Sequence, residues 1–145
     1  MSHLRKAYVL DASVLIEILA GSGVVKDLVD SIIIGDTDAY VTRLSLTEAL
    51  YVTCRLWGQE RALERMQTLI DSRTFTIIED EKIWEHAANC KCQIPISLGD
   101  CYTLAAAKKY GITPLFLRAE REILRNKERI KEWLGKQPEY LITML

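Results

Sequence analysis

The sequence predicts a single α/β domain over residues 1–145, in which a mostly parallel sheet of four or five strands carries helices on both faces. Three observations predict this fold. Short apolar, β-prone runs alternate with helically spaced stretches along the whole chain. Glycines and prolines stand at many of the junctions between them. With 145 residues, 49% of them hydrophobic, the chain can bury a sizeable core without disulfides or metal ions to brace it.

The first half of the chain alternates between strand and helix signals. The apolar run at residues 7–10 predicts a strand, and the side-chain oxygens of Asp11 and Ser13 can start a helix after it. Ser45 and Glu48 fit a capping box ahead of helically spaced apolar residues. The elements expected here are a strand at 7–10, helices from 14 to 19 and from 24 to 34, a strand at 39–43, and helices over 46–57 and 59–72.

The second half repeats the alternation. Residues 74–78 are rich in β-branched side chains, and Asp80 can cap the helix that follows. Pro114 should stand at the beginning of the fourth strand, because proline cannot donate to a sheet ladder. The elements expected here are a strand at 74–78, helices over 81–92 and from 97 to the stop at Gly111, a strand at 113–117, a helix over 119–134 and a fifth strand at 140–143.

Composition excludes several classes of protein. The formal net charge of -1 provides no global positive field, so a polyanion would have to be met by local basic patches. The longest apolar runs fall well short of the ~20 residues that cross a bilayer, so no membrane association is expected. The first residues carry no signal-peptide apolar region, which favours a cytoplasmic location.

The four cysteines fit the same compartment. They lie in expected helices, where buried free thiols are common, and the spacing of Cys90 and Cys92 beside His86 is not that of a zinc site. The sequence therefore indicates a reducing environment, with Cys54 and Cys101 as core thiols.

Four acidic residues stand at comparable junctions of the predicted sheet. Asp11 follows the first strand, and Glu48 lies in the first turn of the helix after the second. Asp100 opens the helix before the fourth strand, and Glu120 follows that strand. Ligands of parallel sheets gather beyond the carboxyl ends of the strands. Carboxylates brought together there repel one another unless a cation neutralises them, which predicts a site for Mg²⁺ or Mn²⁺.

Each of these acids also has a purely structural interpretation. Glu48 fits a capping box that begins at Ser45, and Asp100 fits the looser pattern that begins at Ser97. Glu120 would suit a helix N-terminus through the helix dipole, and Asp11 could simply cap the first helix. A shared site explains all four positions at once, whereas the structural interpretation needs a separate reason for each.

Three segments carry a resemblance to a known family. VLDASVLI at 9–16, SLTEALY at 45–51 and ISLGDCYTLAAA at 96–107 resemble, in order and spacing, the signature blocks of PIN-domain proteins, particularly the VapC-type toxins of prokaryotic toxin–antitoxin pairs. The resemblance implies a three-layer α/β sandwich and a metal-dependent endoribonuclease that forms a homodimer and binds an antitoxin protein. Asp11, Glu48 and Asp100 match the acidic residues of the family, and Ser13 matches a small hydroxyl residue that could hold Asp11 or a metal-bound water.

The fourth block departs from the family pattern. Glu120 stands where the family has an aspartate, and Arg118 stands in place of a small hydroxyl residue. This departure motivates an alternative, a catalytically weak PIN-like module that serves as an RNA-binding or scaffold subunit. In the main interpretation, Asp11, Asp100 and Glu48 hold the ion, Glu120 acts from the rim, and a water attacks phosphorus in line.

Arginines next to the fourth block could guide RNA. Arg118, Arg121, Arg125 and Arg129 recur at helical spacing beside Glu120. They form either a solvated helix face or a surface that tracks phosphates toward the acids, and Arg43 could add to the latter.

Overall fold

Five strands form a sheet in the order β3-β2-β1-β4-β5 in the computed structural model, which describes residues 5–143. Every strand pairing among these residues is parallel, and β1 occupies the centre. The prediction of a mostly parallel sheet is therefore confirmed. The strands are β1 (Lys6–Leu10), β2 (Thr37–Thr42), β3 (Phe75–Ile78), β4 (Thr113–Phe116) and β5 (Glu139–Tyr140).

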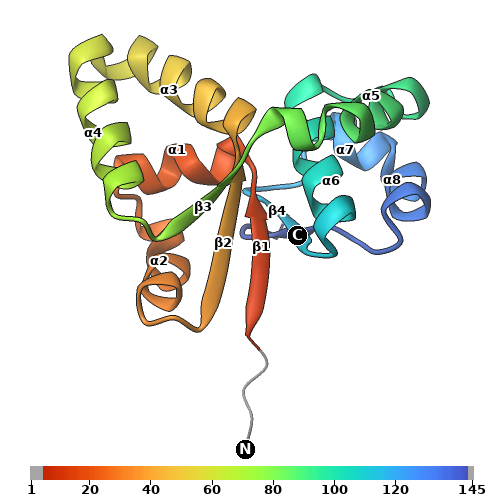
Figure 1. Cartoon of the computed structure of the whole chain (residues 1–145), viewed down its shortest axis with the longest axis horizontal. Coiled ribbons are helices and arrows are strands. Elements are labelled where there is room, and N and C mark those ends of the chain that lie inside the picture. The colour runs from red at the N-terminus through yellow and green to blue at the C-terminus, as the bar shows by residue number, and fades with distance from the viewer. Residues whose placement is uncertain (1–4, 144–145) are drawn as a thin grey trace, which may run out of the picture.

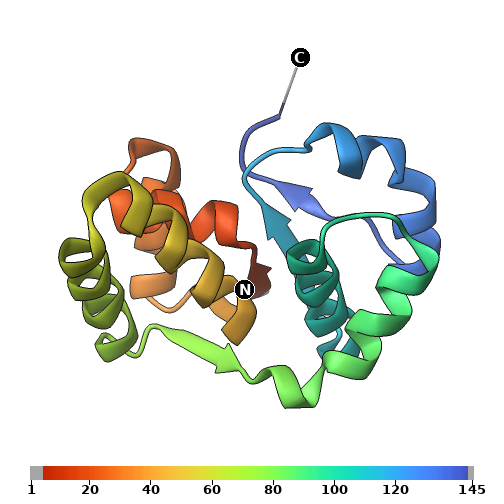
Figure 2. The same ribbon diagram turned by 90° about the horizontal axis from the view of Figure 1, so that it is seen from above.

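Helices cover both faces of the sheet, as the views from the side and from above show (Figures 1 and 2). One group is α1 (Ala12–Ala20), α2 (Lys26–Ile33), α3 (Arg43–Trp57) and α4 (Gln59–Asp71). The other group is α5 (Trp84–Gln93), α6 (Leu98–Tyr110), α7 (Arg121–Arg125) and α8 (Lys127–Leu134). Short 3₁₀ turns occupy Gly23–Val25 and Asp80–Lys82. The arrangement is the three-layer sandwich that the resemblance implied.

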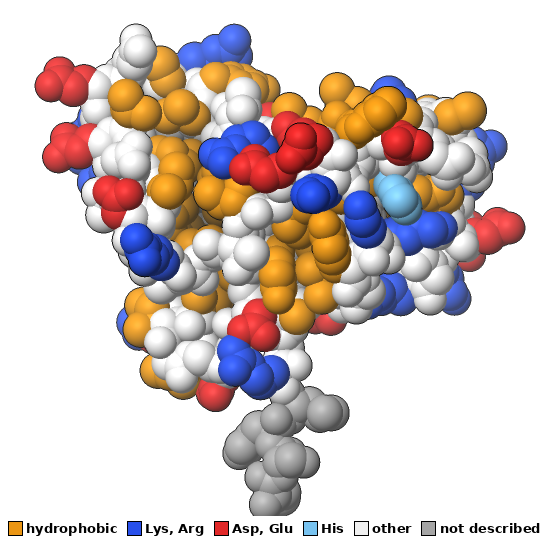
Figure 3. Space-filling view, in the orientation of Figure 1, with side chains coloured by type: hydrophobic (Ala, Val, Ile, Leu, Met, Phe, Trp, Pro, Cys, Tyr) orange, Lys and Arg blue, Asp and Glu red, His pale blue; other side chains and the backbone are white. Residues whose placement is uncertain are grey.

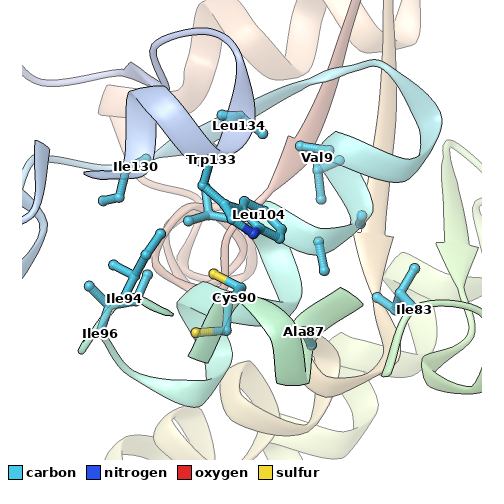
Figure 4. Close-up of a cluster of buried hydrophobic side chains, with 14 of the residues drawn as sticks. Val9, Ile83, Ala87, Cys90, Ile94, Ile96, Leu104, Ile130, Trp133 and Leu134 are labelled. Carbon is cyan, nitrogen blue, oxygen red and sulfur yellow. The ribbon is translucent and has the colours of Figure 1, made fainter. Parts of the chain in front are cut away.

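The central strand separates two hydrophobic cores. Tyr8 and Leu10 pack toward α1 and α3, whereas Val9 points the other way, because successive side chains of a strand face opposite sides. Figure 4 shows the second core, where Val9 and Leu104 lie near Trp133 and Cys90. Because both faces are buried, β1 is apolar at consecutive positions, and its functional residue can come only at its end.

Local capping differs from the sequence prediction at two helices. Thr42, not Ser45, caps α3: its Oγ1 accepts a hydrogen bond of 3.0 Å from the Ser45 backbone N–H. The helix therefore begins three residues earlier than predicted, and Glu48 is not part of a capping box. Asp80 does not cap the helix after it; its Oδ1 accepts a hydrogen bond from the backbone N–H of Leu44, in α3.

The predicted helix over residues 119–134 is broken into α7 and α8. The break lies at Asn126, which has φ -111° and ψ 18° and whose side-chain amide donates to the Glu122 carbonyl at 2.9 Å. A side-chain bond to the backbone of the preceding turn accompanies the interruption of the helix. The predicted fifth strand at 140–143 is in fact the two-residue strand β5.

The remaining sequence expectations concern membranes and cysteines. Within residues 5–143, no helix combines the length and the apolarity needed to cross a membrane. All four cysteines are free: Cys90 and Cys101 are buried, Cys54 is half-buried and Cys92 is exposed. The neighbours Cys90 and Cys92 thus face different environments, which does not suit a shared zinc ion.

Candidate active site

A small cavity opens at the edge of the sheet toward which the β1 arrow points in Figure 1. It measures about 160 Å³ and lies where β1 and β4 end. Asp11 follows β1 directly, and its backbone N–H donates a 2.9 Å hydrogen bond to the Leu115 carbonyl of β4. The lining residues are Asp11, Ser13, Ser97, Asp100, Phe116, Arg118, Glu120, Glu122 and Ile123.

Asp11 is buried and held at both carboxylate oxygens. Its Oδ2 accepts hydrogen bonds from the backbone N–H and the hydroxyl of Ser13, at 3.0 and 2.8 Å, and its Oδ1 accepts one from Thr103 at 3.3 Å. The Ser13 hydroxyl in turn accepts from the Leu117 N–H at 3.1 Å. Burial raises the pKa of Asp11, and the hydrogen bonds from Ser13 and Thr103 oppose that rise. Asp11 thus caps α1 and also points a fixed carboxylate toward the cavity.

Asp100 lies in the first turn of α6, whose N-cap is Ser97. The Ser97 Oγ accepts a hydrogen bond from the Asp100 N–H at 3.2 Å, as the capping pattern in the sequence predicted. Burial and then the charge of Asp11 raise the pKa of Asp100 to about 7, with smaller contributions from Glu122 and Glu48. The side-chain hydrogen bond with Ser97 acts in the opposite direction.

Glu48 reaches the same region from α3. Its Oε1 is buried and has no hydrogen-bond partner, the only such side-chain atom in the described part of the chain. Burial first, and then the charge of Asp11, raise the pKa of Glu48. An unpaired buried carboxylate oxygen costs stability, so a helix-capping role does not account for this side chain.

Two glutamates complete the acidic lining, although the sequence singled out only one. Glu120 is exposed and precedes α7, and its side chain makes no capping hydrogen bond. Glu122, in the first turn of α7, lines the same cavity, and its charge contributes to the raised pKa of Asp100. Acidic residues two positions apart, at 120 and 122, were the only signal in the sequence, and both suited a helix N-terminus equally well.

Thr103 is the second residue that sequence reasoning missed. It lies one turn after Asp100 on α6 and is fully buried. The available signal was its spacing: positions 100 and 103 share a helix face. Ser97 also lines the cavity in addition to capping α6.

The predicted arginines are only partly brought together. Arg118 lines the cavity, whereas Arg121 and Arg125 lie exposed on α7 outside its lining. The break at Asn126 separates them from Arg129, so the four do not share one continuous helix. Arg43 forms a two-pronged ion pair with Glu79, with distances of 2.9 and 2.8 Å.

Charges elsewhere are mixed. On the face shown in Figure 3, basic and acidic side chains are interspersed. This distribution agrees with the formal net charge of -1, which required any basic patch to be local.

The donor set fits a hard divalent cation. Among residues 5–143, no three His, Cys, Asp or Glu side chains are already gathered tightly enough to enclose an ion. The acids instead stand as mutually repelling carboxylates with raised pKa values, one of which has an unpartnered buried oxygen. A cation would satisfy that oxygen and offset the repulsion, and Mg²⁺ and Mn²⁺ prefer oxygen ligands. Asp11, Asp100 and Glu48 are the residues that could hold it.

Comparison with known proteins gives a family and several solved structures. A family model described as the PIN domain matches residues 8–128, a range that contains all the acids above. No curated protein sequence matches the chain.

Three solved structures share the fold. VapBC2 from Rickettsia felis, bound to a DNA fragment from its promoter, superposes with a TM-score of 0.66 at 12% identity, over 82% of this chain and 92% of that one. A toxin–antitoxin complex from Klebsiella pneumoniae gives 0.61 at 17% identity, over 80% and 89%. VapC20 from Mycobacterium tuberculosis, described as a sarcin–ricin loop cleaving toxin, gives 0.54 at 16% identity, over 75% and 86%.

Proposed function

The chain belongs to the PIN domain family, and from this premise we propose that it is an endoribonuclease that depends on Mg²⁺ or Mn²⁺. Asp11, Asp100 and Glu48 would hold the ion. The observation that carries the proposal is the buried, unpartnered Oε1 of Glu48. Burial, and then the charge of nearby Asp11, raise the pKa of this carboxyl. A metal-dependent nuclease site would explain why the chain keeps an unpartnered, buried carboxylate oxygen that costs stability.

The residues of the site would divide the work. Ser13 and Thr103 hold the Asp11 carboxylate in one orientation, which fixes the position of a ligand before substrate arrives. Arg118, on the cavity wall, would donate to the phosphate oxygens of the RNA backbone. Glu120 and Glu122 keep negative charge at the rim. The chemistry supplied by a bound divalent ion is Lewis acidity, which polarises a phosphoryl oxygen and lowers the pKa of the attacking water.

The substrate and partners follow from the same premise. We propose single-stranded or looped RNA as substrate, since VapC20 is described as cleaving the sarcin–ricin loop. The VapBC2 and Klebsiella structures are toxin–antitoxin complexes, which supports an antitoxin protein as a partner of this chain. A homodimer acting in the cytoplasm completes the proposal.

The direct test is cleavage of a labelled looped RNA with Mn²⁺, with EDTA, and with the Asp11→Asn variant. Wild type should cleave with Mn²⁺ alone. Asp11→Asn should lose at least ~100-fold in rate, because it removes a ligand of the ion, and loss of a group that merely orients a ligand already costs about 10- to 100-fold. Cleavage that persists in EDTA would contradict the metal-dependent mechanism.

A second function is favoured by one observation. Arg118 occupies the cavity wall where the family has a small hydroxyl residue, so the chain could bind RNA without efficient cleavage. This alternative is the RNA-binding or scaffold subunit. If wild type binds the same labelled RNA but does not cleave it under any metal condition, the RNA-binding or scaffold function is selected.

A further inference from the structure

Gly99 differs from every other glycine of the chain in what surrounds it. A Cβ built on Gly99 would lie 2.0 Å from Oε1 of Glu48, 2.7 Å from its Cδ and 2.8 Å from its Oε2. At the other six glycines, all within the described residues, a Cβ would meet nothing within 4 Å. The Glu48 carboxylate therefore occupies the volume that any side chain at position 99 would need.

Backbone conformation does not require a glycine at this position. Gly99 is the second residue of α6 and is absent from the glycines with positive φ. Alanine would suit the helix better, because glycine loses more conformational freedom on folding. The close approach of Glu48 is thus the reason for a glycine here.

The contact combines two unfavourable features at one point. Glycine weakens the start of α6, and the Oε1 of Glu48 is buried against it without a hydrogen-bond partner. Gly99 also directly precedes Asp100 in the first turn of α6. This turn therefore carries Asp100 and also leaves the space that the Glu48 carboxylate fills. Destabilising features that meet at a site are typical of function rather than stability.

We propose that Gly99 is a positioning residue that leaves room for the Glu48 carboxylate beside Asp11 and Asp100. The role in metal binding rests on the proposed function, whereas the contact between Gly99 and Glu48 does not. The atoms that a Cβ would strike are at the end of a flexible side chain, so Gly99→Ala forces Glu48 to rotate away rather than forcing α6 to move. The variant should therefore fold and lack only the correctly placed Glu48.

The metal test compares Mn²⁺ affinity by calorimetry in wild type, Gly99→Ala, Glu48→Ala and the double variant. Gly99→Ala should weaken Mn²⁺ binding about 10- to 100-fold, the range for residues that orient metal ligands. It should have no further effect when Glu48 is already alanine. Gly23→Ala is the matched control, because Gly23 also has no positive φ and a Cβ there meets nothing, so its affinity should equal that of wild type.

A second measurement needs no metal. Chemical denaturation of the same proteins in EDTA gives the effect of Gly99→Ala on unfolding with and without the Glu48 carboxylate. In the Glu48→Ala background the alanine should stabilise the protein, because only the glycine penalty is removed. In the wild-type background the gain should be smaller or reversed.

The outcomes separate this proposal from the proposed function. Equal effects of Gly99→Ala on stability in both backgrounds would overturn the positioning role. If wild type binds Mn²⁺ and Gly99→Ala binds it equally well, the role in the metal site is also overturned. Failure of wild type to bind Mn²⁺ contradicts the metal-dependent function and the metal role of Gly99, while the denaturation result still decides whether Gly99 places the carboxylate.

Discussion

The hydroxyl of Thr103 donates a hydrogen bond of 3.3 Å to Oδ1 of Asp11, which joins the first turns after β1 to the body of α6. Both residues are buried, Thr103 completely. The bond fixes one carboxylate oxygen, and Ser13 fixes the other. Asp11 is thereby the most constrained acid of the cavity.

Replacing Thr103 by valine removes this donor while keeping a branched side chain of similar size. Mn²⁺ affinity, measured by calorimetry, should fall about 10-fold, the lower end for loss of a group that orients a ligand. Thr53→Val is the control, because the buried Thr53 hydroxyl bonds only to carbonyls of its own helix. Equal affinities in both variants would mean that Thr103 does not orient Asp11 for an ion.

The raised pKa of Asp100 predicts how apo stability depends on pH. The unfolded chain loses this proton near its ordinary pKa of 3.8, whereas the folded protein keeps it until about pH 7. Between these values the native state binds more protons, so the free energy of unfolding should fall as pH rises from 4 to 7.

Denaturation in EDTA at several pH values tests this, with Asp100→Asn as the matched variant. Between pH 4 and 7 the free energy of unfolding of wild type should fall by roughly 2–4 kcal/mol. Asn cannot titrate, so the variant should not show this decrease. Saturating Mg²⁺ should restore wild-type stability at pH 7 by binding only the folded state. Parallel pH curves for the two proteins in EDTA would show that Asp100 has an ordinary pKa.

Glu122 and Glu120 make different predictions, because the charge of Glu122 acts on Asp100. Glu122→Gln should lower the pKa of Asp100, which carboxylate NMR measures. It should also weaken Mn²⁺ binding. Glu120→Gln should weaken binding less, and Glu120→Asp, which keeps the charge, should differ little from wild type. A larger effect at Glu120 than at Glu122 would return the fourth acidic position to the one expected from the sequence.

Arg118 should matter more for RNA binding than the arginines of α7. Arg118→Ala removes a cation from the cavity wall, so it should raise KM for RNA. The slope of log affinity against log salt concentration should become shallower by about 1, the value for one lost phosphate contact. Joint replacement of Arg121 and Arg125 by glutamate should weaken binding only if these exposed residues track phosphates. An unchanged salt titration in that double variant would show that they form a solvated face.

The sequence predicted the layers of this fold because consecutive apolar residues in β1 require burial on both faces. It also predicted the neighbourhood of Asp11, Asp100 and Glu120, since the ends of parallel strands meet at one edge. The predicted cap of α3 was wrong because Thr42 and Ser45 can each supply a capping oxygen. β2 ends at Thr42 and α3 begins at the next residue, so Thr42 is the cap.

The contacts that refine the site depend on distances between distant segments. The spacing of Thr103 from Asp100 indicates a shared helix face, but it does not indicate the bond to Asp11. The fit of Glu48 against Gly99 has no local signature. Each contact joins two helices or a helix and a strand end. The break at Asn126 was missed because the surrounding residues keep helical spacing across it. Glu122 was assigned to the helix dipole and not to the site, because an acid in a first turn is ordinary in any helix.

The strand order has a consequence for synthesis of the chain on the ribosome. β1, β2 and β3 can pair as soon as they emerge, but the other neighbour of β1 is β4, which is made about a hundred residues later. Asp11 receives its backbone partner from Leu115, and it shares its cavity with Asp100 of α6 and with Glu120 and Glu122 at the start of α7. The acids therefore come together only after β4 and the segment that follows it have been made, and a nascent or truncated chain that ends before β4 carries Asp11, Glu48 and Asp100 without an assembled centre.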